Sequence, residues 1–132
     1  MEIRKKEFNF RGKNTDELQK LDVREFASFL KSRQRRTVLR QFQQIEEFVK
    51  RVQGKLAKGK KSVRTHYRDL VIVPQLIGVK LQIYNGKDFV PVEVTGDMLG
   101  HKFGEFAPTR ARIKHTKSGV GATKGSKHKS KK

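Results

Sequence analysis

Cysteine is absent from this 132-residue chain. Its absence excludes a disulfide framework, a thiol nucleophile and any zinc site built from cysteine ligands, and it fits a reducing compartment. Long apolar runs are also missing, because the longest strongly apolar run, Leu70–Val73, is too short to span a bilayer. The first ten residues, MEIRKKEFNF, contain no apolar signal core. We therefore expect a cytoplasmic protein that has no membrane partner.

Acidic residues are scarce relative to basic ones. The chain has 13 Asp and Glu against 32 Lys and Arg, which gives a formal net charge of +19. A compact fold that carries this excess repels itself unless a polyanion or counterions neutralise it. Hydrophobic residues make up only 34% of the chain, so the core must be small, and part of the chain should be extended or ordered by a partner.

Sequence signatures of catalytic and metal sites are missing as well. The chain has no HExxH motif, no P-loop, no GxSxG elbow and no carboxylate cluster for magnesium. His101 and Glu105 could serve a ribonuclease that has a basic cleft, but no second acid–base partner has a fixed spacing to them. We expect no catalytic residue, no metal site and no cofactor. In this interpretation His101 hydrogen-bonds locally or touches phosphate, and Glu105 pairs with a nearby base.

Composition divides the chain into three zones, and no internal repeat is present. Residues 1–62 are a helical, basic N-terminal extension, residues 63–109 are the core, and residues 110–132 are a basic C-terminal tail. The tail holds nine Lys and Arg, no acid and almost no large apolar residue. Ordering such a segment without burial is unfavourable, so we expect it to be disordered in the free protein.

Two helices are predicted in the first zone. Asp22 and Glu25 resemble a capping box at the start of the first helix. The apolar residues on one face of this helix are Val23, Phe26, Ala27 and Leu30. The apolar stripe of the second helix is formed by Phe42, Ile45, Phe48, Val49, Val52 and Leu56. Residues 31–40, which are expected to lie between these two helices, hold five basic residues and no acid.

The second zone changes to an alternating pattern that is typical of strands. Residues 79–84 and 88–94 alternate apolar and polar side chains, with Asn85-Gly86 between them. This arrangement is the strongest short-range hairpin signal, and both turn positions are expected to have positive φ. Pro91 has no N–H to donate, so its strand should lie at a sheet edge or at a break in pairing. Residues 70–73 are a candidate further strand that Pro74 ends. The pattern predicts an α+β fold.

Three basic runs, residues 31–40, 50–68 and 110–132, contain no acidic residue. A solubilising charged face usually mixes signs. Each Lys or Arg that neutralises a phosphate releases condensed counterions, and arginine also offers a planar fork for phosphates and a face for bases. The runs therefore predict nucleic-acid binding. A DNA-compacting, chromatin-like protein is the alternative, since Lys/Gly/Ser tails bind duplex DNA without sequence preference.

The stretch GHKFGEFAPTR, residues 100–110, has no role in the DNA-compacting alternative. Glycines 96, 100 and 104 lack side chains, so we expect the main chain to approach a ligand closely here. Phe103 and Phe106 are expected to anchor the loop to the small core, although they could instead stack on unpaired bases. The loop would then present basic side chains to RNA.

Residues 84–110, YNGKDFVPVEVTGDMLGHKFGEFAPTR, resemble the signature of the small-subunit ribosomal protein family numbered nineteen in bacteria and fifteen in eukaryotes. The similarity extends back through RTHYRDLVIVPQLIG, residues 64–78, and is strong over residues 63–115. Three further segments are similar to the archaeal and eukaryotic branch: FRG at 10–12, RQRR at 33–36 and GVGAT at 119–123. The chain thus resembles an archaeal-type member of this family.

The resemblance implies a structural role in the cytoplasmic ribosome. Members of the family sit on the head of the small subunit, bind its rRNA and contact the neighbouring head protein numbered thirteen in bacteria. Their C-terminal tail extends toward the tRNA-binding decoding region, which makes tRNA a further implied partner. The implied fold is a small α+β domain, with N-terminal helices around a short, mainly antiparallel sheet that contains the Asn-Gly hairpin.

Carried over position by position, the resemblance makes residues 63–109 an rRNA-binding core and implies individual rRNA contacts. These implied contacts are Arg33, Arg35, Arg36, Arg64, His66, Arg68, Lys80, Asn85, Lys87, His101, Lys102, Arg110, Arg112, Lys114 and His115. The tail residues expected to meet tRNA or rRNA in the assembled particle are Lys117, Lys124 and Lys127.

Overall fold

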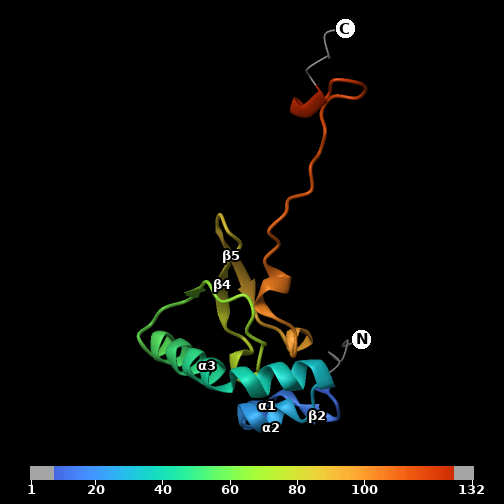
Figure 1. Cartoon of the computed structure of the whole chain (residues 1–132). Coiled ribbons are helices and arrows are strands. Elements are labelled where there is room, and N and C mark those ends of the chain that lie inside the picture. The colour runs from blue at the N-terminus through green and yellow to red at the C-terminus, as the bar shows by residue number, and fades with distance from the viewer. Residues whose placement is uncertain (1–7, 127–132) are drawn as a thin grey trace, which may run out of the picture.

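A computed structural model describes residues 8–126 of the chain. Figure 1 shows a layer of helices beneath a small sheet, with the C-terminal segment extending away from both. The layer is made of α1 (Thr15–Gln19), α2 (Val23–Ala27) and α3 (Ser32–Ala57). None of the helices in the described part of the chain is both long enough and apolar enough to cross a membrane.

A short hairpin, which the helical pattern of the first zone does not predict, precedes the helices. Strands β1 (Asn9–Phe10) and β2 (Lys13–Asn14) pair antiparallel. The two residues between them both have positive φ, 47° for Arg11 and 80° for Gly12. Tight hairpin turns of this kind favour Asn-Gly or Gly-Gly, and arginine rarely adopts positive φ. The Arg11 position therefore carries no hairpin signal in the sequence.

Helix α2 begins as the capping box predicts. The side chain of Asp22 accepts a hydrogen bond from the Val23 amide at 2.8 Å, and the side chain of Glu25 accepts one from the Asp22 amide at 3.1 Å. The predicted apolar face is confirmed, because all four of its residues are buried: Val23, Phe26, Ala27 and Leu30.

Helix α3 is longer than its apolar stripe predicts, and this corrects the expectation that residues 31–40 connect two helices. The helix starts at Ser32, so nearly all of this basic segment is helical, and Val38 within it is fully buried. Arginine and glutamine are good helix formers, and the buried Val38 and the hydrogen bonds of Arg35 hold this end of α3 near α2. Of the predicted stripe, Leu56 at the C-terminal end stays 37% exposed.

The main sheet has three strands in the order β3 (Val63–Thr65), β4 (Lys80–Tyr84) and β5 (Phe89–Glu93). Strand β3 runs parallel to β4, and β4 runs antiparallel to β5, with Tyr84 opposite Phe89. The predicted hairpin is therefore present, and Pro91 lies on an edge strand as expected. Only Gly86 in its turn has positive φ, at 98°, so the expectation of positive φ at Asn85 was wrong. The loop contains four residues, 85–88. Positive φ at both central residues is required only in a two-residue turn, so Asn85 does not need it.

Residues 70–73 are not a strand of this sheet, which corrects a second expectation. All four side chains are buried, and the segment makes one isolated antiparallel bridge, between Val71 and Lys102. Pro74 then begins a 3-10 helix over Pro74–Leu76. A short continuous apolar run identifies burial but does not by itself distinguish a strand from other buried segments.

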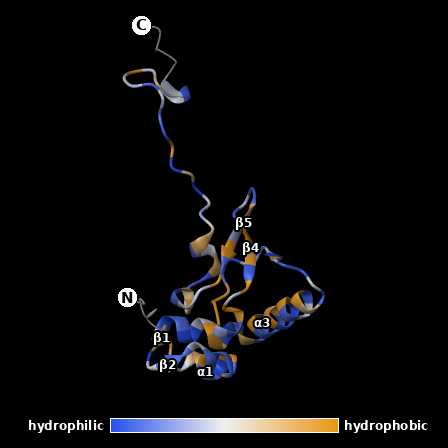
Figure 2. Cartoon of the chain, turned by 180° about the vertical axis from the view of Figure 1, so that it is seen from behind, coloured by the Kyte–Doolittle hydropathy of each residue, from blue (hydrophilic) through white to orange (hydrophobic). Residues whose placement is uncertain are grey.

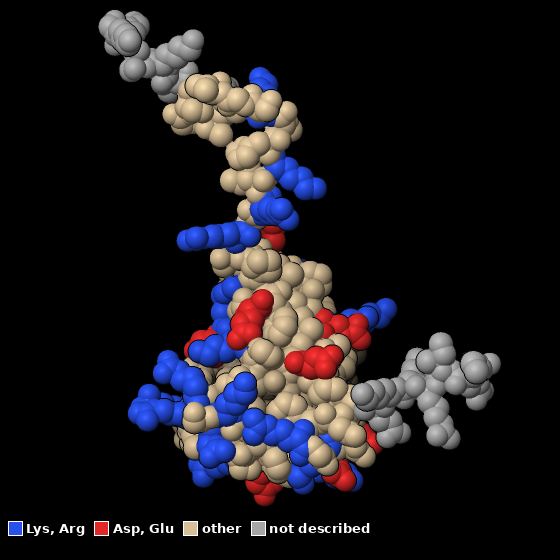
Figure 3. Space-filling model, turned by 90° about the vertical axis from the view of Figure 1, so that its right-hand side faces the viewer, with Lys and Arg blue, Asp and Glu red and all other residues tan. Residues whose placement is uncertain are grey.

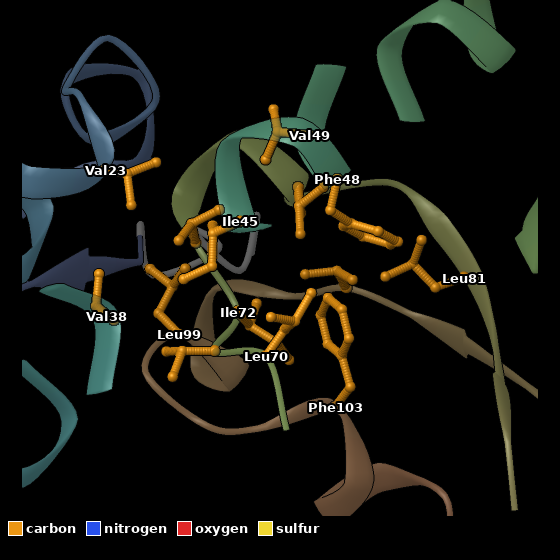
Figure 4. Close-up of a cluster of buried hydrophobic side chains, with 14 of the residues drawn as sticks. Val23, Val38, Ile45, Phe48, Val49, Leu70, Ile72, Leu81, Leu99 and Phe103 are labelled. Carbon is orange, nitrogen blue, oxygen red and sulfur yellow. The ribbon is translucent and has the colours of Figure 1, made fainter. Parts of the chain in front are cut away.

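One hydrophobic core joins the helices, the 70–73 segment and the sheet. Figure 4 shows α3 side chains such as Phe48 facing Leu81 of the sheet and Phe103 of a later loop. Figure 2 shows hydrophobic residues concentrated in the strands and in the segments between the two layers. The last buried residue of this core is Ala107, and the basic segment begins shortly after it.

Candidate nucleic-acid interface

The first turns of α3 present a row of free guanidinium groups. Arg33, Arg36 and Arg40 are exposed and follow one another at intervals of three and four residues, so they share one helical face. None of the three guanidinium groups hydrogen-bonds or forms an ion pair within residues 8–126. Together with the half-exposed Leu39 they line an open groove along the helix. This face can neutralise phosphates without breaking any internal contact.

Arg35 belongs to the same RQRR segment, but its guanidinium group forms hydrogen bonds within the protein. Its Nε donates to the carbonyl oxygen of Ala27 at 3.2 Å, and its Nη2 donates to those of Ser28 at 2.9 Å and Leu30 at 3.3 Å. The carbonyls of Ala27 and Ser28 lie at the C-terminal end of α2, where helix carbonyls lack partners within the helix, and the Leu30 carbonyl follows that end. Arg35 therefore caps α2, and its contact with rRNA stays a prediction.

The loop of residues 100–107 is held on the body by its backbone and by Phe103. The Ile72 amide donates to the His101 carbonyl at 2.8 Å, and the Phe103 amide donates to the Leu70 carbonyl at 3.1 Å. The Phe103 ring is buried and lies 5.3 Å from the Phe48 ring of α3. The predicted anchoring is thus confirmed for Phe103. Phe106 is partly buried and also packs against the core, with its ring edge-on to the imidazole of His101.

The side chains of His101 and Glu105 contact each other within the described part of the chain. Nδ1 of His101 lies 2.7 Å from Oε2 of Glu105, and both side chains are about half exposed. Glu105 also accepts from the Lys102 amide at 3.4 Å. The local interpretation of this pair is confirmed. The carboxylate sits in the first turn of the 3-10 helix Phe103–Phe106, where it satisfies an amide of the loop.

The glycines of this region allow the chain to approach itself. A Cβ at Gly96 would lie 2.5 Å from the Phe8 ring, one at Gly100 would lie 2.9 Å from Leu30, and one at Gly104 would lie 3.1 Å from the Arg68 carbonyl oxygen. The close approach that the sequence predicts at these positions is therefore intramolecular. These glycines therefore seat the loop against the rest of the chain, and the close approach of a ligand there stays a prediction.

A groove joins this loop to the start of α3. Arg33, Gln34 and Thr37 line it from the helix, and Gly100, Lys102 and Glu105 line it from the loop. The fold thus brings together Arg33 and Lys102, two predicted rRNA contacts that lie far apart in the sequence. Two cations on either side of one groove are arranged to hold a phosphate chain between them.

A second groove lies at the opposite end of α3, beside the sheet. It is lined by Lys55 and Lys60 near the helix end and by Arg64 and Gln82 of the sheet. Arg64 donates from Nε to the side-chain oxygen of Gln82 at 3.0 Å. Sequence reasoning did not select Lys55 and Lys60 individually, although both belong to the acid-free run of residues 50–68.

Arg68 is bound within the fold. Its guanidinium donates to three carbonyl oxygens, those of Tyr84 at 2.6 Å, Gly104 at 2.9 Å and Ala107 at 2.7 Å. Hydrogen bonds from a charged group to backbone carbonyls are among the stronger ones in proteins. Arg68 therefore ties the sheet to the loop and to the base of the tail, and an rRNA contact by it stays a prediction.

The hairpin between β4 and β5 carries further predicted contacts. The side-chain oxygen of Asn85 accepts hydrogen bonds from the amides of Lys87 at 3.0 Å and Asp88 at 2.8 Å, so it shapes the turn. Lys87 is exposed at the tip, and Lys80 is exposed at the other end of β4, opposite Glu93. Of these predicted contacts, Lys80 and Lys87 have exposed charged groups that a partner can reach.

The C-terminal segment leaves the body beside the hairpin, as Figure 1 shows. None of residues 110–126 is buried. The predicted contacts on this segment are all exposed: Arg110, Arg112, Lys114, His115, Lys117 and Lys124. Lys127 lies outside the described residues. Figure 3 shows basic side chains along this segment and over the lower part of the body, with several acidic side chains between those regions.

The predicted residues therefore fall into separate basic groups. They are the α3 face with the 100–107 loop, the sheet with its hairpin, and the extended C-terminal segment. No group of three or more His, Asp or Glu side chains that could hold a metal ion occurs within residues 8–126. The arrangement offers cations spread over several elements of the chain.

Comparison with known proteins agrees with this arrangement. The sequence profile of the family described as Ribosomal protein S19 matches residues 31–115, which is more than half of the chain. The chain belongs to the Ribosomal protein S19 family. A relative from Methanococcoides burtonii, named small ribosomal subunit protein uS19, is 45% identical over 124 residues, covering 94% of this chain and 88% of the relative. A protein of the same name from Methanocella arvoryzae is 44% identical over 125 residues, covering 95% and 87%.

The S19 family membership confirms the resemblance that residues 63–115 carry and its archaeal character. The match also includes residues 31–62, where the sequence segments quoted for the resemblance cover only RQRR at 33–36. Proteins of the S19 family are structural components of the small ribosomal subunit, and this chain is not an enzyme. The ribonuclease alternative for His101 and Glu105 is thereby excluded.

Proposed function

We propose that this protein is a structural component of the head of the small ribosomal subunit in the cytoplasm, where it binds small-subunit rRNA. In this proposal the C-terminal tail reaches toward the tRNA-binding decoding region. The body contacts the neighbouring head protein numbered thirteen in bacteria. The names of the relatives and the family membership support the subunit, and the charged surface supports the rRNA contact.

The observation that carries rRNA binding is the groove between α3 and the 100–107 loop. Arg33 and Lys102 line it from separate elements. Neither side chain has an acceptor within residues 8–126, and Arg36 extends the row along α3. Because double-stranded RNA hides its base edges in a deep, narrow groove, a protein of this kind reads backbone shape at folded junctions. A groove with cations on both walls suits such a backbone.

The test compares binding of the full chain to an rRNA fragment from the small-subunit head and to random duplexes of RNA and DNA. We expect a preference for the head fragment and an affinity that falls steeply with salt. The variants Arg33→Glu and Lys102→Glu should each weaken binding to the fragment by about tenfold or more, since each replaces a phosphate contact by repulsion. The matched control is Lys20→Glu, an exposed lysine at the end of α1 with the same change of charge.

Co-sedimentation provides a second measurement. Tagged protein should remain in the small-subunit peak of a sucrose gradient after a high-salt wash. Equal affinity for the head fragment, for random RNA and for DNA duplex would contradict the proposal and favour the DNA-compacting alternative.

A further inference from the structure

The sheet has one face in the core and one face open. Along β3 and β4 the side chains of Val63, Thr65, Leu81 and Ile83 are buried. The residues that alternate with them, Arg64, Gln82 and Tyr84, lie on the other face and are exposed or half-exposed. No helix or loop of the described residues buries this second face, so its side chains are available to a partner.

Three rings gather at the hairpin end of this open face. The centroid of the His66 ring lies 4.7 Å from that of Tyr84 and 5.2 Å from that of Phe89, and Tyr84 and Phe89 lie 5.1 Å apart. His66 comes directly after β3, while Tyr84 and Phe89 are opposite each other across β4 and β5. We call these three residues the aromatic group. His66 is exposed and the other two are half-exposed, so the rings are not enclosed in the core.

Arg64 connects the aromatic group to a basic groove. Its guanidinium carbon lies 5.3 Å from the centroid of the Phe89 ring. The same side chain lines the groove that also contains Lys55 and Lys60. Cations therefore begin at the edge of the ring cluster and continue away from it toward the end of α3.

We propose that this open face is a binding site for an unpaired RNA nucleotide. The base stacks on the aromatic group, and the adjoining phosphates lie along Arg64, Lys60 and Lys55. The inference rests on the proposed rRNA binding and adds a second mode to it, since the groove at Arg33 and Lys102 contacts backbone alone. Bases that are splayed out of a folded RNA stack on aromatic side chains and on arginine planes, and both are present here.

The combination of rings and cations favours RNA over an acidic protein segment. An acidic peptide would satisfy the three cations but would leave the half-exposed rings without a matching surface. Stabilisation of the hairpin accounts for contact among the rings, but it does not account for the exposed imidazole or for the cations beside it. A nucleotide matches both features, because each one carries a flat base and a phosphate.

Tyr84 provides a direct readout of stacking. The chain has no Trp and two Tyr. In the Tyr67→Phe variant, tyrosine fluorescence therefore comes from Tyr84 alone. Tyr67 packs its ring edge-on against Phe48, and phenylalanine preserves that contact. We expect a short oligoadenylate to quench Tyr84 emission at low ionic strength. An abasic ribose-phosphate chain of the same length and charge should bind without quenching.

Affinity measurements on variants distinguish the contribution of the rings to binding from that of the charged side chains. Phe89→Leu and His66→Leu should each weaken oligoadenylate binding by about tenfold, the order expected for one stacking contact, and leave abasic binding unchanged. Arg64→Gln should weaken both. The matched control is Phe29→Leu, a half-buried ring that also has a cation, Lys13, at 5.3 Å from its centroid but lies outside the aromatic group. Circular dichroism melts confirm that each variant is folded.

Unquenched Tyr84 emission in the presence of bound oligoadenylate would overturn the inference, as would equal losses in Phe89→Leu and Phe29→Leu. Binding of the head rRNA fragment, measured in the same samples, distinguishes the two proposals. If the fragment still binds with its salt dependence intact, only the nucleotide site is wrong. If neither RNA binds, the proposed rRNA binding fails as well.

Discussion

Nη2 of Arg68 donates a hydrogen bond to the carbonyl oxygen of Ala107 at 2.7 Å, across 39 residues of sequence. Ala107 is the last buried residue of the core, so this contact closes the body at the point where the C-terminal segment departs. The same guanidinium holds carbonyls of the sheet and of the 100–107 loop. One side chain therefore joins its own segment to the sheet and to the 100–107 loop.

Replacing Arg68 by methionine removes all three bonds and leaves half-buried carbonyls without donors. We expect the free energy of unfolding to fall by about 2–4 kcal/mol, since bonds to charged groups contribute more than neutral ones. Urea denaturation followed by circular dichroism measures the change. The control is Arg64→Met, an exposed arginine with one side-chain partner, for which a change within about 0.5 kcal/mol is expected. Equal losses would contradict the structural role of Arg68.

Gly100→Ala should destabilise the body by about 1–3 kcal/mol. Gly100 has φ of +81°, and a Cβ there would lie 2.9 Å from Leu30, so the change combines backbone strain with a clash. Gly54→Ala, at an exposed position of α3 where a Cβ meets nothing within 4 Å, should instead stabilise by about 0.5–1 kcal/mol because alanine favours the helix. Thermal and urea unfolding of both variants check the opposite signs.

Arg11 occupies a backbone conformation that suits asparagine better. Arg11→Asn should raise the free energy of unfolding by about 0.5–1 kcal/mol, whereas Arg11→Val should lower it by at least as much, since β-branched residues avoid positive φ. The two variants remove the same charge, so electrostatics cannot produce the difference between them. If asparagine fails to stabilise relative to valine, the φ of 47° is not that of the protein in solution.

Arg33 and Lys102 should act together in binding RNA. Each single alanine variant is expected to weaken binding to the head rRNA fragment and to reduce the salt slope by about one. Because both line one groove, the double variant should show a coupling energy of about 0.5 kcal/mol or more. A pair of distant cations, Arg33 and Lys87, provides the additive control. Strict additivity for Arg33 and Lys102 would place their phosphates on separate parts of the RNA.

Removing residues 116–132 should leave the stability of the body unchanged within about 0.5 kcal/mol, because the described part of this segment buries nothing. The deletion takes away six lysines, so RNA binding should weaken and depend less on salt. We expect residues 116–126 to be disordered in the free protein, and sharp, dispersed NMR signals from them without RNA would contradict that. A loss of stability on truncation would mean that the segment packs on the body.

Much of the fold follows from local patterns in the sequence. The capping box at Asp22, the α3 stripe, the hairpin around Asn85-Gly86 and the edge position of Pro91 all depend on neighbours in the chain, and each was predictable. The parallel pairing of β3 with β4 was not, because three residues carry no register information. The hairpin at residues 9–14 was missed because its turn uses arginine where glycine or asparagine is usual.

The charged surface was predictable in composition but not in arrangement. Acid-free runs predict which segments meet a polyanion, yet they do not distinguish Arg33, whose guanidinium has no partner within residues 8–126, from Arg35, which caps α2. The distinction arises from distant carbonyls that only the folded chain brings near. The aromatic group was likewise not predictable from the sequence. His66, Tyr84 and Phe89 meet only through strand pairing, and each ring alone resembles that of an ordinary surface residue.

The closure of the core at Ala107 has a consequence for biosynthesis. Because Ala107 is the last buried residue of the described core, synthesis from the N-terminus adds every core residue before the basic run of residues 110–132. The terminal lysines are therefore joined only to a chain that already holds all the residues of its described core.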